Sequence, residues 1–274
     1  MTDWVATARE LETLLKLKTF PVGLKTVKTA EDLKSIKCRR PDGIYSLCQL
    51  ITQSRTAGTT IGCTVTDLTP FCGTIAGLRS GVPESYALTI GEVWFKNKEE
   101  ALDKYTVENW PRLPHDHEAI VISPLAAGRI EPDMIIIYGN PAQVTRLING
   151  LQWEHYEKLE FTCCGESACS DSIGRCYVTG KPAVSIPCFG ERRFGHAQDD
   201  ELMVALPPSS IETLITGLKA LDKMGIRYPI VYAGTQVDLM PGFPPSYQKG
   251  IMQDHERLLD NSEPTAQMPG SCGK

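Results

Sequence analysis

The sequence lacks any run of about 20 apolar residues, the length that a helix needs to span a bilayer. Its first ten residues are polar and include two acidic side chains, which is not the pattern of a secretory leader. The net charge is −5, whereas a nucleic-acid-binding protein needs a basic face for phosphates. We therefore expect a soluble cytoplasmic protein that has neither a membrane nor a nucleic acid as its partner.

Common catalytic motifs are also missing. The chain contains no G-x-G-x-x-G, no G-x4-G-K-[ST], no H-E-x-x-H and no G-x-S-x-G, so the usual nucleotide, zinc-protease and hydrolase interpretations have no support. No two cysteines have the C-x2-C spacing of a zinc ribbon, and the closely spaced cysteine run of ferredoxins is absent. Thiolates that converge from separate loops are not excluded by this.

Cysteine itself is plentiful. The ten cysteines among 274 residues are too few for a disulfide scaffold, and a reducing cytoplasm would keep them as thiols. Five of them fall within the 26 residues from Cys163 to Cys188. Such clustering favours a metal or cluster site, and buried thiols that only fill the core are the alternative.

The apolar pattern predicts an α+β fold in a single domain over residues 1–260, followed by a disordered tail over 261–274. The N-terminal part is expected to combine helices with cysteines. Residues 4–17 have the apolar spacing of an amphipathic helix. A short helix is predicted over residues 74–79, and Cys72 lies near its start, just after Pro70.

Two later segments, about 118–153 and 183–222, have the same predicted order of strand, polar loop, strand and helix. The apolar positions of their helices match at an offset of 67 residues. We interpret them as a duplicated β-loop-β-α unit, whose two copies pack into one domain. The first strand of the second copy is expected over residues 183–188, and the link over 161–181 is expected to be a functional loop.

Several segments resemble a known bacterial and archaeal family. The segments that carry this resemblance are YSLCQ at 45–49, PFCGTIAGL at 70–78, GESAC at 165–169, TGKPAVSIPCFGER at 179–192, and DDEL with ALP at 199–202 and 205–207. They are similar to the uncharacterised ArCR family, also called domain of unknown function number 169, over most of residues 10–225. The resemblance brings no activity with it.

The resemblance does imply a set of shared cysteines. They fall on Cys48, Cys72, Cys169 and Cys188, and four is the number of thiolates that a [4Fe–4S] cluster needs. The chain has further cysteines at 63, 163, 164 and 176, which leave the choice of ligands open. Our first hypothesis is a cluster-binding protein, either an oxidoreductase or a cluster-dependent lyase. The alternatives are a non-enzymatic ligand-binding module, and an enzyme with Cys72 or Cys169 as its nucleophile.

Three residues are candidates for binding a small anionic substrate. Arg192 and Arg193 follow Cys188 closely, and guanidinium groups bind anions with two parallel hydrogen bonds. His196 lies in the same loop and is a candidate acid or base. Association into a homodimer is expected only from the general tendency of soluble proteins.

Overall fold

The computed structural model describes residues 2–82, 84, 93–106, 109–232, 234–236, 238 and 240–259. Its strands are β1 (Val22–Val27), β2 (Ile61–Thr64), β3 (Ala119–Pro124), β4 (Met134–Gly139), β5 (Ala183–Ser185) and β6 (Leu202–Leu206). The helices near the sheet are α1 (Trp4–Leu15), α2 (Leu47–Ala57), α3 (Pro70–Ile75), α6 (Pro141–Leu151), the π-helical turn η4 (Ser170–Gly174), α7 (Arg175–Thr179), α8 (Phe189–Arg193) and α9 (Ile211–Lys223). The described residues also form α5 (Lys98–Lys104), α10 (Pro245–Leu259) and the short 3-10 helices η1 (Asp32–Ser35), η2 (Val65–Asp67), η3 (Leu125–Ala127), η5 (Pro208–Ser210) and η6 (Met240–Gly242). The expected tail over 261–274 lies outside the described residues.

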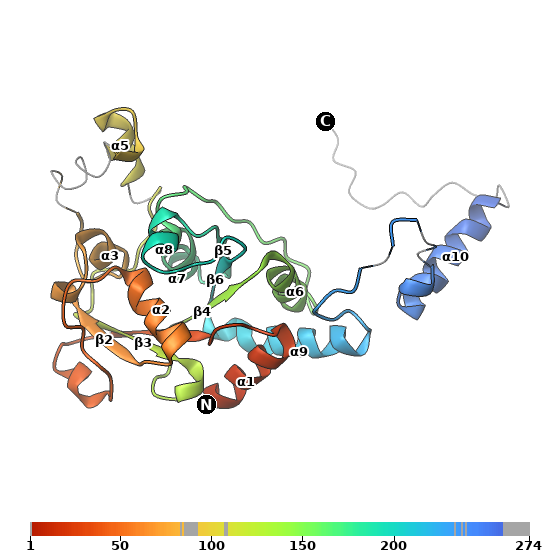
Figure 1. Ribbon diagram of the computed structural model, residues 1–274, viewed down its shortest axis with the longest axis horizontal. Coiled ribbons are helices and arrows are strands. Elements are labelled where there is room, and N and C mark those ends of the chain that lie inside the picture. Colours follow the sequence, from red (N-terminus) through yellow and green to blue (C-terminus); the bar gives the residue numbers. More distant parts are fainter. Residues whose placement is uncertain are drawn as a thin grey trace.

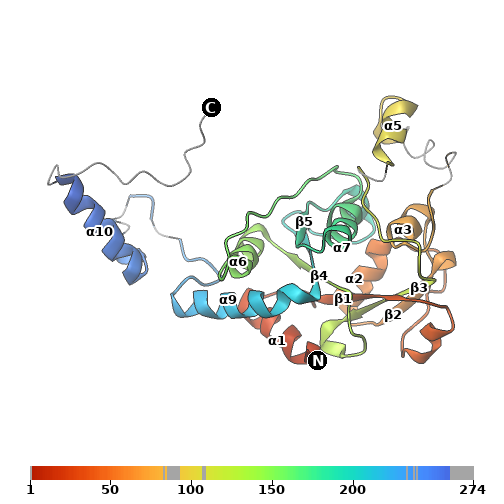
Figure 2. The ribbon, with the colours of Figure 1, turned by 180° about the vertical axis from the view of Figure 1, so that it is seen from behind.

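The six strands form one sheet in the order β2-β3-β1-β4-β6-β5, and every neighbouring pair is antiparallel. The mixed α+β class is therefore confirmed. Helix α10 stands apart from the sheet in both overall views (Figures 1 and 2). Among the residues described, no helix has the length and apolar character needed to cross a membrane.

The predicted duplication is not confirmed. Strands β5 and β6 are neighbours, whereas β1 lies between β3 and β4. A narrower likeness joins β4–α6 to β6–α9. Ile137 pairs with Val204, and Gly150 packs against Gly217, and each of these pairs is 67 residues apart. The likeness does not extend to the first strand of each segment.

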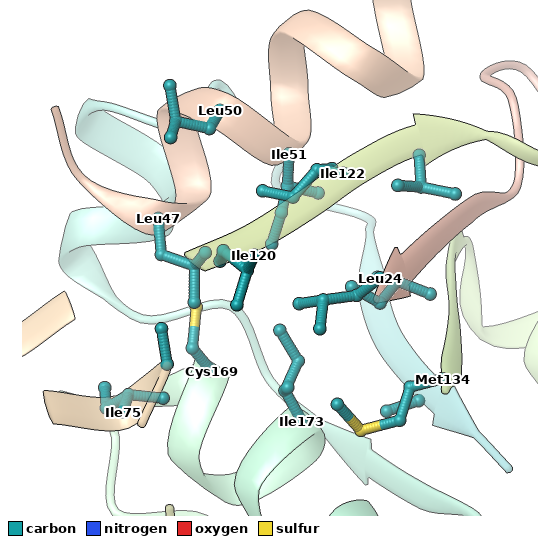
Figure 3. Close-up of a cluster of buried hydrophobic side chains, with 14 of the residues drawn as sticks. Leu24, Leu47, Leu50, Ile51, Ile75, Ile120, Ile122, Met134, Cys169 and Ile173 are labelled. Atoms are coloured by element: carbon teal, nitrogen blue, oxygen red, sulfur yellow. The ribbon is translucent and has the colours of Figure 1, made fainter. Parts of the chain in front are cut away.

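Helices cover both faces of the sheet, because alternate side chains of each strand point to opposite sides. Ile135 and Ile137 of β4 pack with α1, α6 and α9 in one apolar core. Met134, Ile136 and Tyr138 face the other core, which is formed with α2, α3 and η4. Figure 3 shows part of this second core, with Leu47 and Leu50 of α2 on one side and Ile173 on the other. The pleat of β4 therefore directs Tyr138 toward the cysteine-rich side.

Local capping decides where the site helices begin. Ser46 and Gln49 form a reciprocal capping box at the start of α2. Helix α3 begins at Pro70, whose ring suits the first helical position, and a turn at Gly77 with φ of +73° follows its end. The helix is therefore observed four residues earlier than the predicted range 74–79, and Cys72 lies inside its first turn.

The second site segment also differs from expectation. Strand β5 ends at Ser185, two residues before Pro187, which has no N–H for a strand ladder. The predicted strand over residues 183–188 is therefore too long, and Cys188 becomes the N-cap of α8 instead. The expected loop over 161–181 contains η4 and α7, so Cys169 is held at the start of a helical segment.

Candidate functional site

The four cysteines that the resemblance implies as a set lie at the beginnings of four helical segments. Cys48 and Cys72 are in the first turns of α2 and α3. Cys169 immediately precedes η4, and Cys188 caps α8. Three of them are buried, and Cys72 is partly exposed. Exposed backbone N–H groups gather at helix starts, which are therefore suited to negatively charged groups such as thiolates.

The fold brings these four cysteines together. The pKa of Cys48 is raised by burial, by Glu191, and by the nearby thiols of Cys72 and Cys188. The pKa of Cys169 is raised by burial, by Glu191, and by Cys48 and Cys72. Four thiols from segments up to 140 residues apart thus share one electrostatic environment.

The buried carboxyl group of Glu191 is common to the whole quartet. It is 1% exposed and acts on the charge of all four thiols. The thiol of Cys169 donates a hydrogen bond to Glu191 Oε1 over 3.0 Å, and the hydroxyl of Tyr138 donates to Oε2 over 2.8 Å. Burial is the main cause that raises the pKa of Glu191 itself. Sequence reasoning missed this residue, because the N-cap three residues before it is Cys188 and not the Ser or Thr of a recognisable capping box.

Tyr138 is held in turn by a buried ion pair. The guanidinium carbon of Arg55 lies 3.9 Å from the centre of the Tyr138 ring. Arg55 also donates two hydrogen bonds, of 2.9 and 3.1 Å, to the carboxylate of Glu201. Arg55 is 2% exposed, so a buried ion pair supports the Tyr138 ring, and the hydroxyl of that ring in turn holds Glu191.

Backbone amides also point at the sulfur atoms. The amide of Leu47 favours the thiolate of Cys72, and the amides of Ala168, Glu191 and Gly190 favour that of Cys188. Burial outweighs these amides, so the pKa of each thiol remains above its ordinary value. A nucleophilic cysteine needs the opposite shift. The arrangement therefore stabilises thiolates only if a further positive charge is present.

A second buried cation lies near Cys188. Lys104 of α5 is 7% exposed, forms an ion pair with Glu166 and donates a hydrogen bond of 3.0 Å to Ser167 Oγ. Burial lowers the pKa of Lys104 to about 8, and the nearby thiols of Cys164 and Cys188 oppose that effect. Its ammonium group therefore contributes positive charge beside Cys188.

The predicted anion-binding residues lie on the outer side of α8 and the turn after it. Arg192 donates to the carbonyl of Gln198 over 2.8 Å, and Arg193 lies exposed between the rings of Phe189 and Phe194. His196 is exposed, and its carbonyl, not its ring, accepts a hydrogen bond from Arg55. The two arginines and the histidine do not join the quartet.

Of the other cysteines, Cys63 in β2 is buried, and its pKa is raised by burial, by Asp67, and by Cys72 and Cys38, so it lies near one member of the quartet. The others are placed differently. Cys163 and Cys164 are exposed in the chain before η4. Cys176 is buried, and burial alone raises its pKa to about 12, with no contribution from another thiol. Within the described residues, no three His, Cys, Asp or Glu side chains are arranged so that they could hold one metal ion. The quartet is therefore gathered, but not at the spacing of a single-ion site.

Comparison with known proteins gives matches without an assigned activity. A family model described as Uncharacterised ArCR matches residues 10–217. An uncharacterised protein from the archaeon Methanocaldococcus jannaschii is 25% identical over 223 residues, which cover 77% of this chain and 92% of that protein. No solved structure matches the chain.

Proposed function

The chain belongs to the Uncharacterised ArCR family, and we propose that Cys48, Cys72, Cys169 and Cys188 hold an iron–sulfur cluster of the [4Fe–4S] type. The observation that carries the proposal is the convergence of four thiols, from four separate segments, around one buried carboxyl group. Glu191 acts on each of the four thiols, whereas, among the described residues, the buried Cys63 has Cys72 and Cys38 near it and the buried Cys176 has no thiol neighbour.

The donor set suits this cofactor in kind and number. Thiolates are soft ligands that favour iron–sulfur clusters, and a four-iron cluster takes four of them. Because four irons and four sulfides separate its ligands, a cluster spreads its cysteines further apart than a single ion does. Thiols that are gathered but too far apart for one ion are therefore compatible with a cluster. The amides directed at Cys72 and Cys188 are of the kind that stabilise cluster sulfurs and adjust the reduction potential.

The charge balance also supports a bound cationic core. Four thiols and Glu191 lie together, and Glu191 and the neighbouring thiols raise the cost of ionising Cys48 and Cys169. A cationic cluster core would supply the missing positive charge and allow the thiols to ionise. The chain's own residues would then hold the core, shield it from water and orient its ligands through Tyr138 and Arg55.

We place this protein among cytoplasmic oxidoreductases or cluster-dependent lyases that act on a small anionic molecule. A bound cluster would provide one-electron transfer or a Lewis-acidic iron. The raised thiol pKa values weigh against the alternative of a nucleophilic Cys72 or Cys169. Arg193 is the exposed cation nearest in sequence to the quartet that could attract an anion, and its role remains a prediction.

The test is purification without oxygen, followed by iron and sulfide analysis and an absorption spectrum. We expect about four irons and four sulfides per chain, and a broad visible band that dithionite bleaches. Cys48→Ser, Cys72→Ser and Cys188→Ser should each lose the band. Cys176→Ser is the matched control, because it removes a buried thiol outside the quartet and should keep the band. Fewer than about half an iron per chain after reconstitution would refute the proposal.

A further inference from the structure

The quartet and Glu191 together offer one donor more than a four-iron cluster requires. Four thiols and one carboxylate occupy the same buried environment. Two of these donors, Cys169 and Glu191, are in direct contact, because the Cys169 sulfur lies 3.0 Å from Glu191 Oε1. They are 8% and 1% exposed, so the contact is inside the protein and does not arise from a mobile surface chain.

The other three sulfurs are held differently. Cys48 lies 3.0 Å from Ser46 Oγ and donates a hydrogen bond of 3.6 Å to the carbonyl of Gly190. The Thr69 side chain and the Leu47 amide favour the Cys72 thiolate, and backbone amides favour that of Cys188. The hydrogen-bond partners of these three sulfurs are therefore uncharged hydroxyl and backbone groups. The Cys169 sulfur is instead hydrogen-bonded to a side chain that can itself bind a metal. Cys169 and Glu191 are thus directed at one another, and their contact joins two metal-binding groups.

We propose that Cys169 and Glu191 are alternative ligands of one iron, while Cys48, Cys72 and Cys188 bind the other three. This inference rests on the proposed function. Either donor binds iron only in its deprotonated form, and the proton of Cys169 is released to water when its sulfur binds. A carboxylate oxygen is a harder ligand than a thiolate and suits an iron–sulfur cluster less well. The iron that can carry Glu191 is therefore the one most easily opened to a small anionic ligand.

The neighbouring residues fit this role. Tyr138 holds the second oxygen of Glu191 over 2.8 Å, so Oε1 alone remains directed at Cys169. The chain at Gly195 packs directly against Cys48 and the Glu191 carboxylate, which only a residue without a Cβ allows. A Cβ at this position would lie 2.8 Å from Cys48 Cβ and 3.1 Å from Glu191 Oε2. The close packing keeps the carboxylate within the quartet.

The experiment measures iron, sulfide and the visible and electron paramagnetic resonance spectra of anaerobically reconstituted full-length variants. In Cys169→Ser, we expect at least about half of the wild-type iron to be retained, with an altered spectrum, because Glu191 takes over as the ligand. In Glu191→Gln, Cys169 should keep the cluster. The double variant C169S/E191Q lacks both donors and should lose iron at least about tenfold. Cys48→Ser and Cys176→Ser are the bleached and unbleached references.

The outcomes separate this inference from the proposed function. If the wild-type protein holds a cluster but Cys169→Ser is bleached as completely as Cys48→Ser, Glu191 is not an alternative ligand. Retention of the cluster by the double variant would overturn the inference equally. If the wild-type protein holds no iron, the proposed function itself fails. Cys169→Ala replaces the serine variant if circular dichroism shows that the serine variant does not fold.

Discussion

Replacing Arg55 with leucine while Glu201 remains should lower the free energy of unfolding by about 3–5 kcal/mol. Arg55 and Glu201 are 2% and 7% exposed, and two hydrogen bonds of 2.9 and 3.1 Å join them. The single replacement leaves a buried carboxylate without its counter-charge. The backbone amide of Gln198 still donates to Glu201 over 2.9 Å, so we expect the lower end of that range, about 3 kcal/mol. Total stabilities are about 5–15 kcal/mol, so such a loss is readily measured.

The double variant R55L/E201L should recover most of this loss, because a buried ion pair contributes little more than an apolar pair of similar size. We expect it to lie within about 2 kcal/mol of the wild type, with the lost contact of Arg55 to the Tyr138 ring accounting for the remainder. The assay is urea unfolding at pH 7, followed by circular dichroism. Lys219→Leu is the control, because its ion pair with Glu10 is half exposed and should matter by less than about 1 kcal/mol. A loss below about 1 kcal/mol in R55L, or no recovery in the double variant, would refute the reasoning.

Two further predictions concern the buried carboxyl group and the helix contact. Burial raises the pKa of Glu191 above its usual 4.5, so the folded metal-free protein holds this proton more tightly than the unfolded chain does. Its stability should therefore fall as the pH rises from about 4.5 through the raised pKa, and Glu191→Gln should remove that part of the decline in urea titrations. An equal decline in both proteins would contradict this assignment. Gly217→Ala would place a Cβ 2.1 Å from the carbonyl oxygen of Gly150, so α6 and α9 must separate, at a cost of about 1–3 kcal/mol. Gly250→Ala, which meets open space in α10, should not destabilise the protein, and equal melting temperatures for the two variants would argue against the close contact.

The local elements were largely predictable from the sequence. The apolar spacing of α1, α6 and α9 places one face of each helix in the core. The structure has α1 within the expected residues 4–17, and α6 and α9 at the ends of the segments for which helices were expected. Strand β4 was likewise visible as an apolar run. Helix α3 and strand β5 were misjudged at their ends, because single prolines, Pro70 and Pro187, decided where these elements start and stop.

The order of the strands was not predictable in this way. Hydrophobic periodicity reports which face of a strand is buried, but not which strand lies beside it. The insertion of β1 between β3 and β4 depends on contacts between residues about 100 positions apart, such as Val22 with Pro124 and Val22 with Ile136. An apparent duplication in sequence therefore did not determine an equivalent pairing of strands.

In the candidate site, too, the residue types were visible in the sequence and their arrangement was not. Family resemblance indicated Cys48, Cys72, Cys169 and Cys188, because each lies in a short recognisable segment. Nothing in those segments states that they meet, nor that Glu191 lies among them and is held by Tyr138, whose ring contacts Arg55. The sequence by itself determined the chemistry of the donors and the local caps that hold them. The tertiary structure alone decided that they share one buried environment, because burial and electrostatic proximity arise only when distant segments pack together.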